Sequence, residues 1–428
     1  MKNLCLNIAF LTMVYMTPSL AVTNALWSHL DHADALNHHG VETEFIQKGG
    51  ERVLNLTQAE EGRYAWVFIP APVEGWGLDH ANFIEAEINN SGTRAVEVIL
   101  WVVPDRGWDA IGKRATIEAG KSLLFKCNLR ASFKDGTPKL NPHRINKVEV
   151  MFSKAPVGAS IQVKGLSSSG TVPEWVMPEG RMTVPNMETR KYAAGKRVRY
   201  QLLEHRNTDI YSVLYLPKTW TRHGKYPVIV EFPGNIYYTG SVYSSGRPEQ
   251  CAIGYGMSKH EEVIWVSVPF VDYDLNENVE SGFGNADDTA DYTVKLVNEL
   301  VDSFGGDKDN VVITGFSRGA LACGYIGRRN DVIASLWKGF HPCQHYDGDG
   351  WNGADMNGAK ERAKRIGKSP VFHTDNERHE ALKTMLSEVG ADVTFASSGL
   401  GAHATAMFLD DRPSTVQLRD WYGNLIQK

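Results

Sequence analysis

Three things are scarce in this chain of 428 residues: cysteine, long apolar runs and runs of one charge. Beyond its first 25 residues, no stretch approaches the roughly 20 apolar residues that a membrane-spanning helix needs, so no membrane span is expected. A formal net charge of −5 with no long basic run argues against a nucleic-acid partner. Small or neutral substrates fit this charge distribution better.

The first residues have the pattern of an export signal. Met1 and Lys2 precede an apolar stretch that ends at Tyr15, and a site with small residues follows. This pattern predicts a signal peptide over residues 1–25, cleaved after Ala21 or Ala25. The mature protein is therefore expected to be secreted or periplasmic.

Cysteine is used sparingly in the exported part of the chain. Five cysteines are present, and Cys5 lies within the predicted signal. Of the remaining four, Cys323 and Cys343 are plausible disulfide partners, and buried free thiols are the equally favoured alternative. The other two are Cys127 and Cys251.

The most informative motif is Gly315-Phe-Ser-Arg-Gly319, which follows the apolar run Val311-Val-Ile313. A serine on a tight turn between a strand and a helix needs small residues on both sides, because larger side chains would collide with the neighbouring backbone. Residues 320–329 suit the helix that should follow. Ser317 is therefore the predicted nucleophile. In a glycine-rich chain the pattern also arises by chance, so its context decides.

Two further residues supply that context. Asp375 ends the short apolar segment 370–374, and His403 follows the segment 392–397, so both are expected at the carboxyl ends of strands. The chain order Ser, Asp, His is the order that α/β-hydrolases use for their triad. Glu377 lies close enough to compete with Asp375 as the acid. All three predicted triad residues should meet at one edge of a parallel sheet.

From Arg197 onward, strand and helix signals alternate at the spacing of βαβ units. Eight strands are predicted: Val198–Glu204, Tyr211–Leu216, Pro227–Phe232, Val263–Val268, Val311–Thr314, Leu336–Phe340, Val371–Thr374 and Val393–Ala396.

Residues 191–428 resemble a secreted α/β-hydrolase of the esterase and polyhydroxybutyrate-depolymerase type. Segments 211–217, 226–234, 315–319 and 401–403 carry this resemblance. It implies a mostly parallel eight-stranded sheet flanked by helices. The His-Gly pair usual in the oxyanion loop of this family appears here as Pro-Gly.

The resemblance also implies an oxyanion hole made of two backbone N–H groups. One belongs to Arg318, and the other to Asn235 or Ile236 in the loop after the third strand. The side chain of Arg318 either assists the oxyanion, meets a substrate carboxylate, or pairs with a structural carboxylate.

Three aromatic residues are predicted to bind substrate by walling an acyl or sugar pocket: Tyr237, Tyr238 and Trp351. Histidine and aspartate clusters are expected to be structural, so no metal and no cofactor is predicted. These clusters lie within residues 29–39, 341–345 and 347–352.

Residues 26–166 show short alternating segments and almost no helical periodicity, which predicts a β-sandwich. Its six predicted strands are Ala65–Ile69, Phe83–Ile88, Ala95–Val103, Ser122–Phe125, Lys147–Phe152 and Ser160–Lys164. Segments 144–152 and 159–166 resemble galactose-binding-like jelly rolls, so carbohydrate binding is one expected role. Residues 167–190 are predicted as a linker. Five tryptophans could form a sugar platform or, more commonly, core: Trp27, Trp66, Trp76, Trp101 and Trp108.

Together these features predict a secreted serine carboxylester hydrolase with an acyl-enzyme mechanism. Its expected substrate is a polysaccharide carrying acetyl, feruloyl or uronoyl esters, or a small ester. Two alternatives stay open: a polyhydroxyalkanoate depolymerase or serine peptidase on the same fold, and a catalytically inactive carbohydrate-binding protein. The sequence leaves the oligomeric state open.

Overall fold

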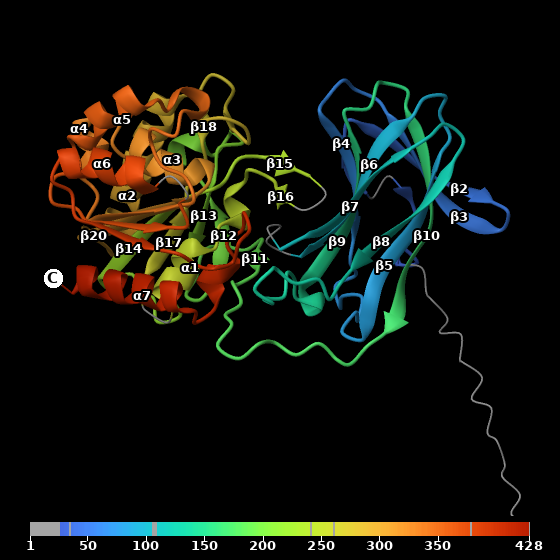
Figure 1. Ribbon diagram of the computed structural model, residues 1–428, viewed down its shortest axis with the longest axis horizontal. Helices are drawn as coiled ribbons and strands as arrows, with labels where there is room; N and C mark the ends of the chain where they lie inside the picture. Colours follow the sequence, from blue (N-terminus) through green and yellow to red (C-terminus); the bar gives the residue numbers. More distant parts are fainter. Residues whose placement is uncertain are drawn as a thin grey trace, which may run out of the picture.

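The structure is a computed structural model, and Figure 1 shows its two domains side by side. The predicted signal peptide, Trp108 and Glu377 lie outside the described residues. The structure describes residues 26–33, 36–104, 109–239, 242–259, 262–376 and 379–427.

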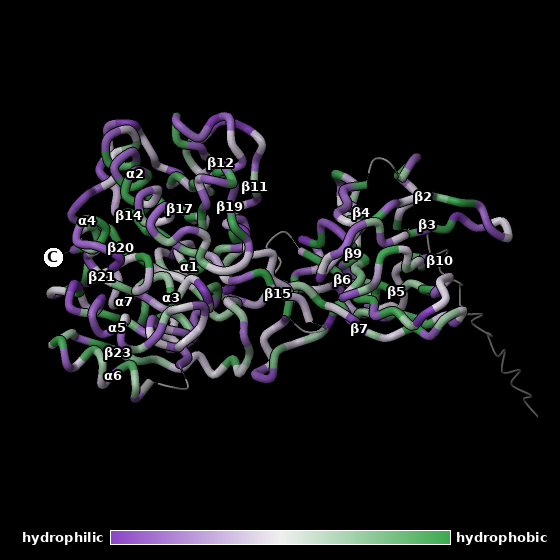
Figure 2. Tube along the Cα trace, turned by 90° about the horizontal axis from the view of Figure 1, so that it is seen from above, coloured by the Kyte–Doolittle hydropathy of each residue, from purple (hydrophilic) through white to green (hydrophobic). Residues whose placement is uncertain are grey.

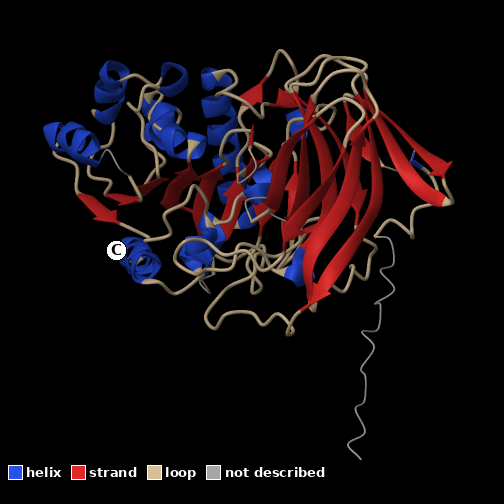
Figure 3. Ribbon diagram, turned by 45° about the vertical axis from the view of Figure 1, so that its right-hand side comes forward, coloured by secondary structure: helices blue, strands red, loops and turns tan. Residues whose placement is uncertain are grey.

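The first domain consists of two five-stranded antiparallel sheets (Figure 3). One sheet has the order β1 (Asn37–His39), β4 (Tyr64–Pro70), β9 (Ile145–Ser153), β6 (Val96–Pro104) and β7 (Ile111–Ile117). The other has the order β2 (Val41–Lys48), β3 (Glu51–Gln58), β10 (Ser160–Thr171), β5 (Ala81–Asn90) and β8 (Ser122–Asn128).

Alternation along the strands creates the core between these sheets. In β4, Ala65, Val67 and Ile69 are buried inside, while the residues between them face outward. All six predicted strands overlap observed ones, but β1, β2, β3 and β7 were not predicted. Strand β10 runs on to Thr171, so the predicted domain end at residue 166 was too early.

The second domain is built on a nine-stranded sheet. Six of its eight neighbouring pairs are parallel, and the pairs on either side of β13 are antiparallel. The strand order is β11 (Met187–Glu188), β12 (Arg197–Tyr200), β13 (Ser212–Tyr215), β17 (Ile264–Ser267), β14 (Tyr226–Phe232), β20 (Gly306–Phe316), β21 (Gly339–Cys343), β22 (Val371–Thr374) and β23 (Val393–Ala396).

Two expectations about this sheet were wrong. The sheet has nine strands instead of eight, because the short β11 adds an edge inside the predicted linker. The sixth strand was predicted at Leu336–Phe340 but occupies Gly339–Cys343. Proline lacks the N–H that a sheet ladder uses, which made Pro342 look like a loop residue. Here Pro342 pairs with Gly315 of β20 inside the sheet.

Helices cover both faces of this sheet (Figure 1). One apolar cluster joins the sheet to helices on one face, and a second cluster joins it to helices on the other. The first face carries α2 (Ala286–Phe304), α3 (Arg318–Tyr325), α4 (Asp331–Ala334), α5 (Met356–Ala363) and α6 (His379–Glu388). The second carries α1 (Ile253–Ser258) and α7 (Pro413–Ile426). No helix in the described part of the chain is long and apolar enough to cross a membrane.

The two domains meet through a hairpin made of β15 (Tyr237–Tyr238) and β16 (Tyr243–Ser244), and Figure 2 shows β15 between them. Tyr238 and Tyr243 share an apolar cluster with the outer face of the sandwich, which includes the fully buried Trp101. Trp101 is therefore core rather than a sugar platform. The Tyr243 hydroxyl donates to the Glu149 carboxylate at 2.8 Å.

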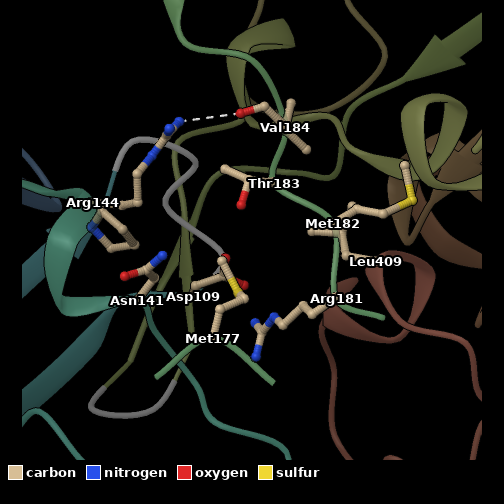
Figure 4. A pocket seen from close by; sticks show the side chains of 10 residues that line it. Asp109, Asn141, Arg144, Met177, Arg181, Met182, Thr183, Val184 and Leu409 are labelled. Atoms are coloured by element: carbon tan, nitrogen blue, oxygen red, sulfur yellow. Dashed lines mark hydrogen bonds between the residues drawn. The ribbon is translucent and has the colours of Figure 1, made fainter. Parts of the chain in front are cut away.

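The segment between the domains is also fixed to the sandwich. Arg144 donates to the Val184 carbonyl at 3.1 Å, and Arg181 donates to the Pro138 carbonyl at 2.9 Å. Figure 4 shows the small cavity that these side chains surround. Its volume of about 30 Å³ holds little more than one water molecule, so it is no ligand site.

Candidate active site

Ser317 lies on the sharp turn between β20 and α3. Its φ of 56° and ψ of −115° are strained for a residue with a side chain. A Cβ at Gly315 would lie 2.3 Å from the Gly319 carbonyl carbon, and a Cβ at Gly319 would lie 2.0 Å from the Phe232 carbonyl oxygen. Both glycines are thus required by close backbone approach, and the turn exposes the Ser317 side chain at the end of the sheet.

Ser317 opens onto a cavity of about 230 Å³. The cavity brings together the predicted nucleophile and base, two of the three predicted oxyanion residues, and two of the three predicted aromatic walls. Its lining comprises Asn235, Tyr237, Val242, Ser317, Arg318, Leu321, His345, Trp351 and His403.

Two backbone N–H groups at this cavity have no hydrogen bond to another described residue. One belongs to Arg318, the first residue of α3, where helix geometry leaves the N–H without an intrahelical partner. The other belongs to Asn235. The alternative donor Ile236 was a wrong prediction, because its N–H bonds the Glu280 carbonyl at 2.9 Å.

The Arg318 side chain has a role that the sequence did not suggest. It is buried, with its guanidinium 4.1 Å from the centre of the Phe270 ring. Burial lowers its pKa to about 9, so it stays charged at neutral pH. Instead of meeting a carboxylate, it donates to four backbone carbonyls: Gly234, Gly246, Val279 and Gly282.

These contacts position the oxyanion loop. One nitrogen, Nη2, lies 2.8 Å from both the Gly234 and the Gly246 carbonyl oxygens. Those two glycines stand before and after the segment that contains Asn235 and the β15–β16 hairpin. Arg318 therefore ties both ends of this segment to the turn that carries Ser317.

His403 lies beside the nucleophile turn, with its ring centre 4.5 Å from that of Phe316. Burial, together with the neighbouring His345, lowers the pKa of His403 to about 4. Its imidazole is therefore neutral at neutral pH, as a general base must be before it accepts a proton.

A second histidine in the cavity was not predicted as a site residue. His345 lies in the loop after β21, with its ring centre 5.8 Å from that of His403. Its Nδ1 makes a short contact with the Asp349 carboxylate. The spacing of four residues between His345 and Asp349 is a weak signal, and only the fold shows that His345 lines the Ser317 cavity.

Asp375 ends β22 with a positive φ of 51°. It shares a neighbouring cavity of about 830 Å³ with His403, His345 and Asp349. Its carboxylate accepts hydrogen bonds from the backbone N–H and hydroxyl of Ser398, the former at 2.6 Å. Among the described residues these are its hydrogen-bond partners, so its pairing with His403 stays a prediction.

The predicted aromatic walls divide between two cavities. Tyr237 and Trp351 line the Ser317 cavity, with 47% and 38% of their surfaces exposed. Tyr238 was wrongly assigned to this cavity, because it is buried against the sandwich and hydrogen-bonds Tyr64 through its carbonyl at 3.2 Å. Neighbouring residues of a strand point to opposite faces, which separates the two tyrosines.

The remaining chemical candidates are structural. All four described cysteines are free and buried, so the suggested disulfide between Cys323 and Cys343 is absent. His341 lies inside β21 between the hydroxyls of Thr314 and Thr374, at 2.8 and 3.0 Å. Burial lowers its pKa to about 3. Among the described residues, no cluster of three or more histidine, cysteine or acidic side chains could hold a metal.

No protein-family model and no curated protein sequence matches this chain. Similar solved structures include a thermostable esterase, with 12% identity, a TM-score of 0.38, and coverage of 86% of this chain and 96% of that one. A truncated carbohydrate esterase from gut microbiota has 14% identity, a TM-score of 0.37, and coverage of 53% and 93%. A family 11 carbohydrate-binding module from Clostridium thermocellum has 12% identity, a TM-score of 0.24, and coverage of 33% and 86%. With TM-scores below 0.5, these likenesses are too distant to assign a function.

Proposed function

We propose that this protein is a serine carboxylester hydrolase. The observation that carries the proposal is the position of Ser317: a strained turn places it at one cavity with His403 and two backbone N–H groups without partners. Nucleophile, base and oxyanion donors are the parts that acyl transfer needs.

In the proposed reaction, the neutral imidazole of His403 takes the hydroxyl proton as the Ser317 Oγ attacks the ester carbonyl carbon. The N–H groups of Arg318 and Asn235 bind the oxygen that becomes negative, a contribution of roughly 3 to 4 kcal/mol for each donor. The imidazolium then protonates the departing alcohol. A water molecule repeats the sequence and frees Ser317 from the acyl group.

Asp375 is the proposed acid that orients His403, with Glu377 as the competing assignment. Ser398 holds the Asp375 carboxylate at the cavity that His403 also lines. A second carboxylate, that of Asp349, contacts the ring of His345, which lines the same cavity as His403.

The proposed substrate is an acylated polysaccharide outside the cytoplasm, with acetyl, feruloyl or uronoyl esters as the scissile groups. Tyr237 and Trp351 give the cavity two partly exposed aromatic faces, which suit an acyl group or a sugar ring. A polyhydroxyalkanoate depolymerase or serine peptidase would use the same residues.

The test combines activity with covalent labelling. The wild-type protein should hydrolyse p-nitrophenyl acetate and be labelled by a fluorophosphonate at Ser317. Ser317→Ala should lower turnover by roughly 10^6 while the circular dichroism spectrum stays unchanged. An unlabelled, inactive wild-type protein would favour a catalytically inactive carbohydrate-binding protein, and activity of a few per cent in Ser317→Ala would contradict the mechanism.

A further inference from the structure

A second large cavity lies between the two domains. Its volume is about 760 Å³, within the range of sites that enclose small ligands. The sandwich contributes residues of β1, β4 and β9, and the hydrolase domain contributes the β15–β16 hairpin and the residues after it. We call this cavity the interdomain groove. Neither domain forms it alone.

One wall of the groove is a strip of aromatic side chains. Tyr64, Trp66 and Phe68 occupy alternate positions of β4, so all three project from the same face of the sheet. Trp66 and Phe68 are half-buried, and their rings stack with centres 3.9 Å apart and planes inclined by 10°. Because the Lys147 ammonium covers Phe68, 3.2 Å from its ring centre, Tyr64 and Trp66 supply the apolar surface that can meet the C–H groups of a sugar ring.

The charges around the groove are already compensated. Arg247 pairs with Glu280 and Glu249 pairs with Arg199, whereas the Lys147 ammonium lies over the Phe68 ring and 3.9 Å from the Glu149 carboxyl group. A charged ligand would therefore compete with existing pairs, and its desolvation would go uncompensated. Asn37 and Asn146 add exposed amides to the lining, which can donate to and accept from hydroxyl groups.

The groove is next to the proposed active site. Residues 235–238 alternate between the two cavities: Asn235 and Tyr237 line the Ser317 cavity, whereas Ile236 and Tyr238 line the groove. One short segment thus separates the two spaces and carries a proposed oxyanion donor. A ligand in the groove would lie directly behind the wall of the Ser317 cavity.

We propose that the interdomain groove binds a neutral oligosaccharide chain. Aromatic faces, uncharged amides and paired charges together suit a ligand that has apolar ring faces and many hydroxyls but no net charge. The proposal rests on the proposed function in one respect: the chain in the groove would belong to the polysaccharide whose ester reaches Ser317.

Isothermal titration calorimetry on the full-length protein tests this directly. The probes are unsubstituted hexaoses of glucose, xylose and mannose, and a galacturonic acid hexaose as the charged counterpart. Because none carries an ester bond, binding can succeed or fail independently of the Ser317→Ala activity test. At least one neutral hexaose should bind, more tightly than the galacturonic acid hexaose.

Three variants locate the site. Trp66→Ala should weaken binding about tenfold, as expected for an aromatic anchor. Asn146→Ala removes an exposed amide at little risk to folding and should weaken binding about fivefold. Phe83→Ala is the matched control: Phe83 is half-buried with Lys126 4.2 Å from its ring centre, as Phe68 is with Lys147 at 3.2 Å, but it lies on the opposite sheet.

Binding to the control should stay within about twofold of wild type. The proposal is overturned if no neutral hexaose binds, if the galacturonic acid hexaose binds more tightly than all of them, or if Phe83→Ala weakens binding as much as Trp66→Ala. It is also overturned if Trp66→Ala and Asn146→Ala, both folded by their thermal melts, bind as tightly as wild type.

Discussion

Two buried glutamates, one in each domain, are stabilised in different ways. Glu231 in β14 accepts hydrogen bonds from the backbone N–H groups of Ala252, Ile253 and Gly254 and from the Trp265 indole, all within the second domain. Glu149 in β9 is equally buried, but its hydroxyl donor Tyr243 comes from the other domain.

The difference shows that the second domain supplies all the hydrogen-bond donors of its buried carboxyl group, whereas the sandwich depends on its neighbour. Without the hairpin, Glu149 would lose its hydrogen-bond donor, and Lys147 would remain as its charged neighbour, with the ammonium 3.9 Å from the carboxyl group. The apolar residues around Trp101 would also lose their cover. The sandwich therefore behaves less like an independent module than its sequence suggests.

The largest expected effect concerns the proposed catalytic acid in the second domain. Asp375→Asn should lower kcat about 10^4-fold, because an amide no longer stabilises the imidazolium of His403. Glu377→Gln and Asp349→Asn should each cost less. Steady-state kinetics on p-nitrophenyl acetate measure all three, and a larger loss in Asp349→Asn would move the acid to the His345 pair.

A slightly smaller effect is expected at Glu231. Glu231→Ala would leave four buried N–H donors without an acceptor, which should lower the free energy of unfolding by about 4 to 5 kcal/mol. Urea denaturation measures the change. A loss below about 1 kcal/mol would mean that the stability of the second domain does not depend on this internal network.

Tyr243→Phe probes the corresponding contact of the sandwich. Losing one hydroxyl donor to a buried carboxylate should cost about 1 to 3 kcal/mol. The matched control is Tyr255→Phe, because the half-buried Tyr255 hydroxyl makes no hydrogen bond to a described residue. Equal free energies of unfolding for the two variants would contradict the proposal that the sandwich depends on the second domain.

Local features of the site could be predicted from the sequence, because they arise within a few residues. The apolar run before Gly315 and the two flanking glycines determine the turn at Ser317 through contacts of the backbone itself. Period-two alternation likewise revealed six strands of the sandwich. In contrast, β2 and β3 carry so many polar residues that they did not stand out as strands.

Features that depend on distant segments were missed. Ile236 lost its predicted oxyanion role because of the Glu280 carbonyl, and Glu149 meets Tyr243 across 94 residues of sequence. No periodicity encodes such contacts. Tyr238 was missed for a local reason: the segment Tyr237–Tyr238 was not predicted as a strand, and in a strand neighbouring residues point to opposite faces.

The contact between the domains should also depend on pH. Burial raises the pKa of Glu149 above its ordinary value of about 4.5. The folded protein therefore keeps this proton at pH values where the unfolded chain has lost it, so stability should fall as the pH rises from about 4.5 toward neutrality. Each unit by which the pKa is raised corresponds to about 1.4 kcal/mol. Burial lowers the pKa of Lys147 to about 8, so this ammonium group loses its proton mainly in the alkaline range.

Urea denaturation of wild type and Glu149→Gln between pH 4.5 and 7.5 isolates the contribution of Glu149, because glutamine does not titrate. Wild type should lose stability relative to the variant as the pH rises, and a relative gain would contradict the raised pKa of Glu149.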